Sequence, residues 1–301
     1  MNKKLLLGSL VLSASFLPVV SAACVTKQIN DGPKIVELDT RINLNVEKVA
    51  PYMFKAVVVS GADGDTVTVR ALEANEKNGI AEGIQNKIRI AGIDTPEKAV
   101  GGKIASKQEQ HFSTQSSDFA SKTLFNGKEV YVFLTLGGKS DTFGRFTGDI
   151  FYSNEKNQLS SIADVNRSYS VEIIKAGLTL PLDQGGQNLP NMVYSNTAAH
   201  WTYYLMGLAL KYAKDNKIGF FGERPMTTSY NPYEKLAYTA YKIKPIGEGW
   251  RSFAFEGAGN PDIQTVYDYA QFAYKPIKVV YANGEVVENG VITTPAQPVQ
   301  K

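Results

Sequence analysis

The order of the apolar segments limits the fold of this chain more than any other feature. Runs typical of short strands occupy residues 54–59, 66–71, 87–93, 129–134 and 146–152. Between the third and fourth runs, residues 110–124 place apolar side chains at helical spacing. Five short strands with a helix after the third favour an OB-fold barrel, a closed sheet that commonly binds oligonucleotides on one face. We therefore expect an α+β fold: an OB-fold five-stranded β-barrel with packed helices.

The C-terminal half adds helices and an extension. Residues 171–176, which Gly177 follows, predict a short helix with a glycine C-cap. Residues 197–216 predict a long helix with apolar positions throughout. Residues 226–301 form an aromatic-rich C-terminal segment of unassigned role, in which the Asn283-Gly284 pair predicts a hairpin with a type I′ turn.

The first 23 residues have the layout of a signal peptide. Lys3 and Lys4 precede an apolar run over residues 5–20, and the small residues 21–23 follow it. The run is short for a membrane-spanning helix, and Pro18 would strain one. We therefore expect residues 1–23 to direct export.

Cys24 follows the small residues directly, which resembles the lipobox of bacterial lipoproteins. Acyl chains on Cys24 would hold the protein at the cell surface through an N-terminal lipid anchor in the membrane. Ordinary secretion is the alternative. Residues 24–50 are polar with little periodicity, and we interpret them as a tether to the folded part.

Charge and cysteine content exclude several classes of site. The 32 basic and 29 acidic residues nearly balance, so any contact with nucleic acid must come from a local group of cations. The single cysteine excludes an internal disulfide and a zinc site with four cysteine ligands. Catalysis by a zinc cluster or a Cys/His pair is therefore not expected.

Three short motifs carry the candidate chemistry. They are Asp63-Gly-Asp65-Thr66 in a turn, Arg89-Ile-Ala-Gly-Ile-Asp94-Thr95-Pro96-Glu97 along a strand and turn, and Asp141-Thr142-Phe143-Gly144-Arg145 before a strand. Each alone is also compatible with an ordinary turn or a surface ion pair. Together they supply carboxylates for a divalent cation, guanidinium groups for a phosphate, and a further carboxylate to orient or deprotonate water. Phosphodiester hydrolysis needs these three kinds of group.

The three motifs, in this order and on this strand pattern, resemble the staphylococcal thermonuclease family. The resemblance covers about residues 54–222, within an expected domain at 51–225, and includes Lys175-Ala-Gly-Leu178 and the closing segment 209–222. It implies a calcium-dependent nuclease that hydrolyses the phosphodiester bonds of DNA and RNA with little base specificity and leaves 3′-phosphate ends.

The resemblance also implies roles for individual residues. Asp65 and Asp94 correspond to carboxylate ligands of Ca²⁺, with the Thr95 carbonyl as a further ligand. Arg89 and Arg145 correspond to phosphate-binding arginines, and Glu97 to the general base. Where the family has a Lys-Tyr pair that helps to hold the terminal phosphate, this chain has Thr142-Phe143.

Two alternatives to an active nuclease remain. One is a nucleic-acid-binding protein of the same fold without catalysis, for which a broken set of acids and arginines would be expected; the set is complete here. The other is a surface adhesin in which the nuclease-like domain is a scaffold and residues 226–301 bind a host ligand.

Overall fold

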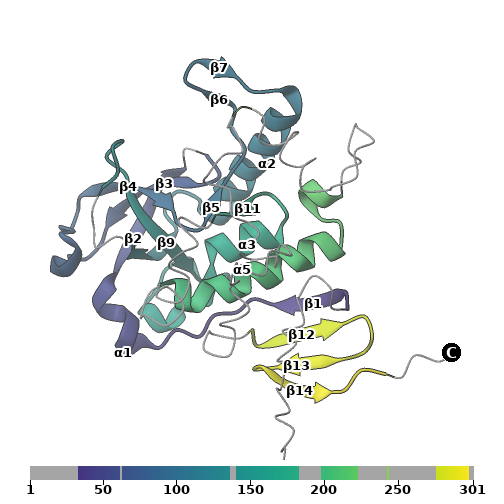
Figure 1. Cartoon of the computed structure of the whole chain (residues 1–301). Helices are drawn as coiled ribbons and strands as arrows, with labels where there is room; N and C mark the ends of the chain where they lie inside the picture. The colour runs from purple at the N-terminus through teal and green to yellow at the C-terminus, as the bar shows by residue number, and fades with distance from the viewer. Residues whose placement is uncertain are drawn as a thin grey trace, which may run out of the picture.

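The computed structural model of the chain describes residues 33–61, 63–135, 140–182, 198–222, 243 and 276–297 (Figure 1). The signal peptide expected at residues 1–23, the lipidation expected at Cys24 and most of the segment 226–301 lie outside the described residues. Within the described ranges, none of the helices is both long and apolar enough to cross a membrane.

A closed five-stranded barrel forms the centre of the described structure. Its strands are β2 (Met53–Gly61), β3 (Thr66–Ala71), β4 (Gln85–Ile90), β8 (Glu129–Leu134) and β9 (Phe146–Tyr152). Neighbours follow the order β8-β2-β3-β4-β9, and β9 pairs with β8 to close the ring. The β4–β9 pair is parallel, and the other pairs are antiparallel. The expected OB-fold barrel is confirmed.

Apolar side chains, alternating along much of β2, β3 and β4 and continuous along β8 and β9, explain why these segments form a barrel. Val67 and Val69 on β3 point into the core, and so do Phe54 on β2, Ile88 on β4 and Ile150 on β9, all at most 2% exposed. Burying one such side chain stabilises the fold by about 1.5–3 kcal/mol. A shift of one residue in register would move a whole strand's apolar set to solvent, so the pattern fixes the pairing.

Helix α2 (Lys107–Thr123) lies between β4 and β8 in the sequence, where the helix after the third strand was expected. It begins before residue 110 because Ser106 caps it: the Ser106 hydroxyl accepts a hydrogen bond from the Glu109 N–H at 3.2 Å. Helices α3 (Tyr169–Lys175) and α5 (Ala198–Asp215) pack against each other beside the barrel (Figure 1). Gly177 ends α3 at φ 64° and approaches the Ile218 carbonyl too closely for a side chain.

Short elements complete the chain. They are α1 (Val46–Val49), β5 (Ile93–Asp94), β6 (Ala99–Val100), β7 (Lys103–Ile104), β10 (Arg167–Ser168), β11 (Leu180–Pro181) and the 3-10 turns at 50–52, 76–78, 162–164 and 219–221. The strand expected over 87–93 is interrupted, because Gly92 takes φ 75° and turns the chain between β4 and β5. Asp94 thus belongs to β5, which pairs with β11.

A second sheet joins the two ends of the described chain. Strand β1 (Ile35–Asp39) pairs with β12 (Lys278–Tyr281), which continues to β13 (Val286–Glu288) and β14 (Val291–Thr294) (Figure 1). The expectation of a polar tether over residues 24–50 is therefore wrong for residues 33–50. Five of their apolar side chains are buried: Ile35, Leu38, Ile42, Leu44 and Val49. The pairing partner of β1 lies more than 200 residues away, so local periodicity does not reveal the strand.

The hairpin expected around Asn283-Gly284 forms, but with another turn. A type I′ turn requires positive φ at both central residues. Gly284 has φ 84°, whereas Lys217 and Asn289 are the non-glycine residues with positive φ in the described part of the chain. The Tyr281 N–H donates to the Glu285 carbonyl at 2.9 Å, so the loop has three residues with the glycine in the left-handed region.

Candidate active site

Asp65 is held at the start of β3 by the segment that follows β5. One of its carboxylate oxygens, Oδ2, accepts hydrogen bonds from the Thr95 N–H at 2.7 Å and the Thr95 hydroxyl at 2.9 Å. Gly64 permits this approach, since a Cβ there would lie 2.7 Å from the Ser116 Cβ and 2.8 Å from the Thr95 Cγ2. The turn Asp63-Gly64-Asp65 therefore packs directly on the second motif.

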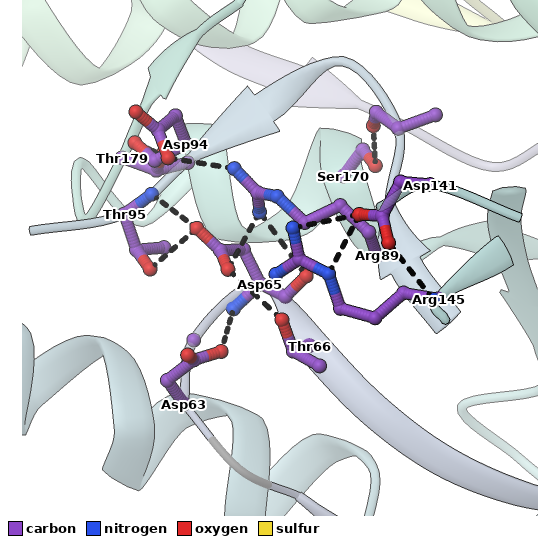
Figure 2. A network of polar contacts seen from close by, with 12 residues as sticks. Asp63, Asp65, Thr66, Arg89, Asp94, Thr95, Asp141, Arg145, Ser170 and Thr179 are labelled. Carbon is purple, nitrogen blue, oxygen red and sulfur yellow. Dashed lines mark hydrogen bonds and ion pairs between the residues drawn. The ribbon is translucent and has the colours of Figure 1, made fainter. Parts of the chain in front are cut away.

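Arg89 on β4 bridges the two predicted calcium-ligand carboxylates (Figure 2). Its Nη1 lies 2.5 Å from Asp65 Oδ1, and its Nη2 lies 2.6 Å from Asp94 Oδ1. Its side chain is only 12% exposed. Burial acts to lower the pKa of Arg89, but the charges of Asp65 and Asp94 outweigh this and raise it. Arg89 is thus a permanently charged guanidinium in contact with two buried carboxylates.

Asp63 belongs to the same acidic group, although the sequence assigned it no role. Its carboxylate accepts a hydrogen bond from the Asp65 N–H at 3.2 Å. Burial raises the pKa of Asp63 to about 6, and the nearby charges of Asp65 and Glu97 add to the shift. The Asp-Gly-Asp motif in the sequence was the signal for this residue, but only the second aspartate of the motif was assigned a role. Glu97, half-buried after β5, therefore lies near this carboxylate group.

Arg145 sits in a turn of its own before β9. Asp141 Oδ2 accepts hydrogen bonds from Arg145 Nε at 2.9 Å and pairs with its Nη2 at 2.9 Å. The other oxygen, Oδ1, caps the turn by accepting hydrogen bonds from the backbone N–H groups of Phe143 and Arg145. Burial acts to raise the pKa of Asp141, yet hydrogen bonds from the Arg145 backbone and side chain lower it overall. Asp141, to which the sequence assigned no role, is thus the direct partner of Arg145.

The barrel brings the Arg145 turn alongside β4. In the parallel β4–β9 pair, Arg89 is opposite Thr147, two residues after Arg145. Arg145 immediately precedes β9, so its turn lies next to β4 and Arg89. The Arg145 guanidinium carbon lies 5.2 Å from the ring centre of Phe143, which is 79% exposed. That both arginines bind one phosphate stays a prediction.

The donor set at this site suits a hard cation. Asp65, Asp94 and the Thr95 main chain are buried and adjacent, and all would contribute oxygen atoms. Among the residues that the structure describes, there is no group of three or more His, Cys, Asp or Glu side chains that could hold a metal. A cation here would therefore depend on few protein oxygens, with water or substrate oxygens completing its shell. The excess of carboxylates over Arg89 favours such a cation.

Comparisons with known proteins agree with this geometry. Residues 87–201 match the family model described as staphylococcal nuclease homologue. An uncharacterized lipoprotein of Mycoplasma genitalium is 26% identical over 250 residues, which cover 82% of this chain and 86% of that protein. The matched family region includes Arg89, Asp94, Glu97 and Arg145, and it begins after Asp65.

Proposed function

We propose that the protein is a calcium-dependent nuclease, a function supported by the match of residues 87–201 to the family model described as staphylococcal nuclease homologue. It hydrolyses phosphodiester bonds in DNA and RNA and leaves 3′-phosphate products. The observation that supports this best is the bridge from Arg89 to Asp65 and Asp94. It joins the Arg89 guanidinium on β4 to two buried carboxylates, one from the turn before β3 and one from β5.

Each residue then has a definite task. Asp65, Asp94 and the Thr95 carbonyl would hold the cation, which would supply positive charge at the scissile phosphate. Glu97 orients water and accepts its proton as the water oxygen bonds to phosphorus and the bond to the 5′ oxygen breaks, and this leaving oxygen takes a proton from solvent. Arg89 and Arg145 donate paired hydrogen bonds to the phosphate oxygens and stabilise the charge that develops on them, usually the largest contribution in such sites. Contacts to phosphate carry little sequence information, so base specificity is low.

Digestion of plasmid DNA and of RNA by the purified protein tests this function. Cleavage is expected with calcium and not with excess chelator, and the products should acquire a 3′-hydroxyl on treatment with a phosphatase. Asp94→Asn, which keeps the shape but removes one ligand charge, should abolish cleavage. Asp118→Asn on helix α2 is the matched control and should cleave normally. Full digestion in excess chelator would contradict the proposal.

The same assay separates the alternatives. A non-catalytic binding protein would retard nucleic acid in a mobility-shift gel without cleaving it. An adhesin would do neither and would bind a host ligand through residues 226–301.

The place of action that we propose is the cell surface, with Cys24 acylated. The support is the sequence before Cys24 and the similarity to a protein described as a lipoprotein. Labelled fatty acid should enter the wild-type protein but not Cys24→Ala, and this substitution should release the nuclease from the membrane or block its processing. Absence of label in the wild type would favour secretion.

A further inference from the structure

Three buried hydroxyl groups from residues 169–179 reach the backbone of both segments that carry the site. Tyr169 donates to the Gly64 carbonyl at 2.8 Å, Ser170 donates to the Ala91 carbonyl at 2.9 Å, and Thr179 donates to the Asp94 carbonyl at 2.7 Å. All three residues are 0% exposed. Figure 2 shows Thr179 next to Asp94. None of the three was expected to take part in the site.

The carbonyl groups that they bind are next to the functional side chains. Gly64 immediately precedes Asp65, Ala91 follows Arg89 by two residues, and the third carbonyl is that of Asp94 itself. The two segments also meet each other directly, through Thr95 and Arg89 to Asp65 and through the β3–β4 ladder. The hydroxyl groups thus hold the segments from outside the site.

The segment that carries the hydroxyl groups is itself firmly placed. Ser168 caps α3 at its N-terminus, and Ile173 and Ile174 are buried in the core. After the helix, Leu180 pairs with Asp94 in the β11–β5 ladder. A site is held accurately when its supporting groups come from rigid elements. Residues 169–179 therefore form a fixed frame against which Asp65 and Asp94 are placed.

We propose that Tyr169, Ser170 and Thr179 are positioning residues that set the separation of the Asp65 and Asp94 carboxylates for calcium. This inference rests on the proposed function, since it concerns the geometry of the same ligands. Groups that orient metal ligands without touching the metal typically change affinity by about 10–100-fold when they are removed. Loss of one hydroxyl group leaves a buried carbonyl without its donor, and the loop that carries it relaxes to find another.

Calcium titration by calorimetry, on the full chain without nucleic acid, tests the inference. Tyr169→Phe and Thr179→Val each remove one hydroxyl group with little change of shape, and each is expected to weaken calcium binding by about tenfold. Thr179→Ser keeps the hydroxyl group and should bind within about twofold of the wild type. This rescue separates the hydrogen bond from a general effect on packing, because serine leaves a larger void than valine.

Matched controls remove hydroxyl groups elsewhere in the same fold. Tyr131→Phe on β8 and Thr114→Val on the exposed face of α2 should leave calcium affinity unchanged. Circular dichroism at the titration temperature verifies that every variant is folded. Wild-type affinity in Tyr169→Phe and Thr179→Val, or equal weakening in Thr179→Val and Thr179→Ser, would overturn the inference while the proposed function stands. A wild-type protein that neither binds calcium nor cleaves would overturn both.

Discussion

Arg89 and Arg145 were expected to perform the same task, but they stand in different surroundings. Arg89 lies in the barrel wall, 12% exposed, and bridges carboxylates from two other segments. Arg145 is 28% exposed and pairs with Asp141 four residues before it, within one turn. The first arginine is thus held by tertiary structure, and the second by its own local sequence.

Because of this difference, the two arginines should contribute differently to stability although they are expected to contribute similarly to catalysis. Arg89 is required by the fold as well as by the proposed chemistry, because Asp65 and Asp94 would be left buried without a cation. Arg145 can be removed with little consequence for folding, since its partner Asp141 is near the surface. Changes at the two sites should therefore have similar effects on turnover and different effects on the free energy of unfolding.

The largest expected effect is on stability. Arg89→Ala should lower the free energy of unfolding by about 3–5 kcal/mol, because it leaves two buried carboxylates unpaired. Arg145→Ala should lower it by less than about 1 kcal/mol, as for a surface ion pair. Urea unfolding, followed by tryptophan fluorescence in calcium-free buffer, measures both. Equal losses in the two variants would remove the distinction between the arginines.

Turnover should respond similarly to lysine at either position. Lysine keeps the charge but lacks the planar pair of donors, so Arg89→Lys and Arg145→Lys should each lower kcat by on the order of 10²–10³, or about 3–4 kcal/mol. The effect should fall on kcat more than on KM, because the contacts strengthen in the transition state. Steady-state kinetics on a short oligonucleotide provides the measurement. Wild-type kcat in both folded variants would exclude the mechanism.

The pH dependence of stability should differ between the surroundings of Arg89 and those of Arg145. Near the Arg89 segment, burial raises the pKa of Asp149 to about 7, and the Ser170 hydroxyl group, 3.3 Å away, opposes the shift. Between about pH 4 and 7 only the unfolded state ionises this group, so stability falls with rising pH by at most about 1.4 kcal/mol per unit. The stability that the uncharged Asp149 carboxyl group contributes is therefore fully present below the unfolded-state pKa. It is lost as the pH rises above the folded-state pKa.

Asp149→Asn replaces the carboxyl group with an amide that is uncharged at every pH. The variant should therefore lose less stability as the pH rises. The comparison is the wild-type free energy of unfolding minus that of the variant, from urea titrations at several pH values between 4 and 8. At Asp141 the sign is opposite: its lowered pKa gives stability above the unfolded pKa that is lost as pH falls. A wild-type minus variant difference that is independent of pH would contradict the assignment for Asp149.

The smallest effect is expected at Phe143, where the thermonuclease family that the sequence resembles has tyrosine. The ring is 79% exposed and stacks near Arg145, so Phe143→Tyr adds a hydroxyl group without disturbing packing. We expect kcat to stay within a few-fold and KM to fall if the hydroxyl group reaches a substrate phosphate. Kinetics on oligonucleotides with and without a terminal phosphate measures this contribution, and a large loss of kcat would show that Phe143 itself acts in the site.

Local patterns predicted the barrel well because burial alternates along much of β2, β3 and β4, while β8 and β9 are short apolar runs buried at nearly every residue. The strands at 66–71, 129–134 and 146–152 begin and end where expected. Residues 33–50 could not be assigned in this way, since β1 becomes a strand only by pairing with β12 far along the chain. The turn at Asn283-Gly284 was also misassigned, because the loop length depends on the register of its two strands.

The sequence by itself determined the types and order of the functional groups: an Asp-Gly-Asp turn, a strand arginine before Asp94-Thr95-Pro96-Glu97, and an arginine turn after Asp141. It did so because these chemical requirements are carried by short, contiguous motifs. Only the tertiary structure decided that Arg89 bridges Asp65 and Asp94, and that Tyr169, Ser170 and Thr179 hold the backbone behind them. Apart from the Arg89–Asp94 pair, those contacts join residues that are far apart in the sequence, and only the tertiary fold brings them together.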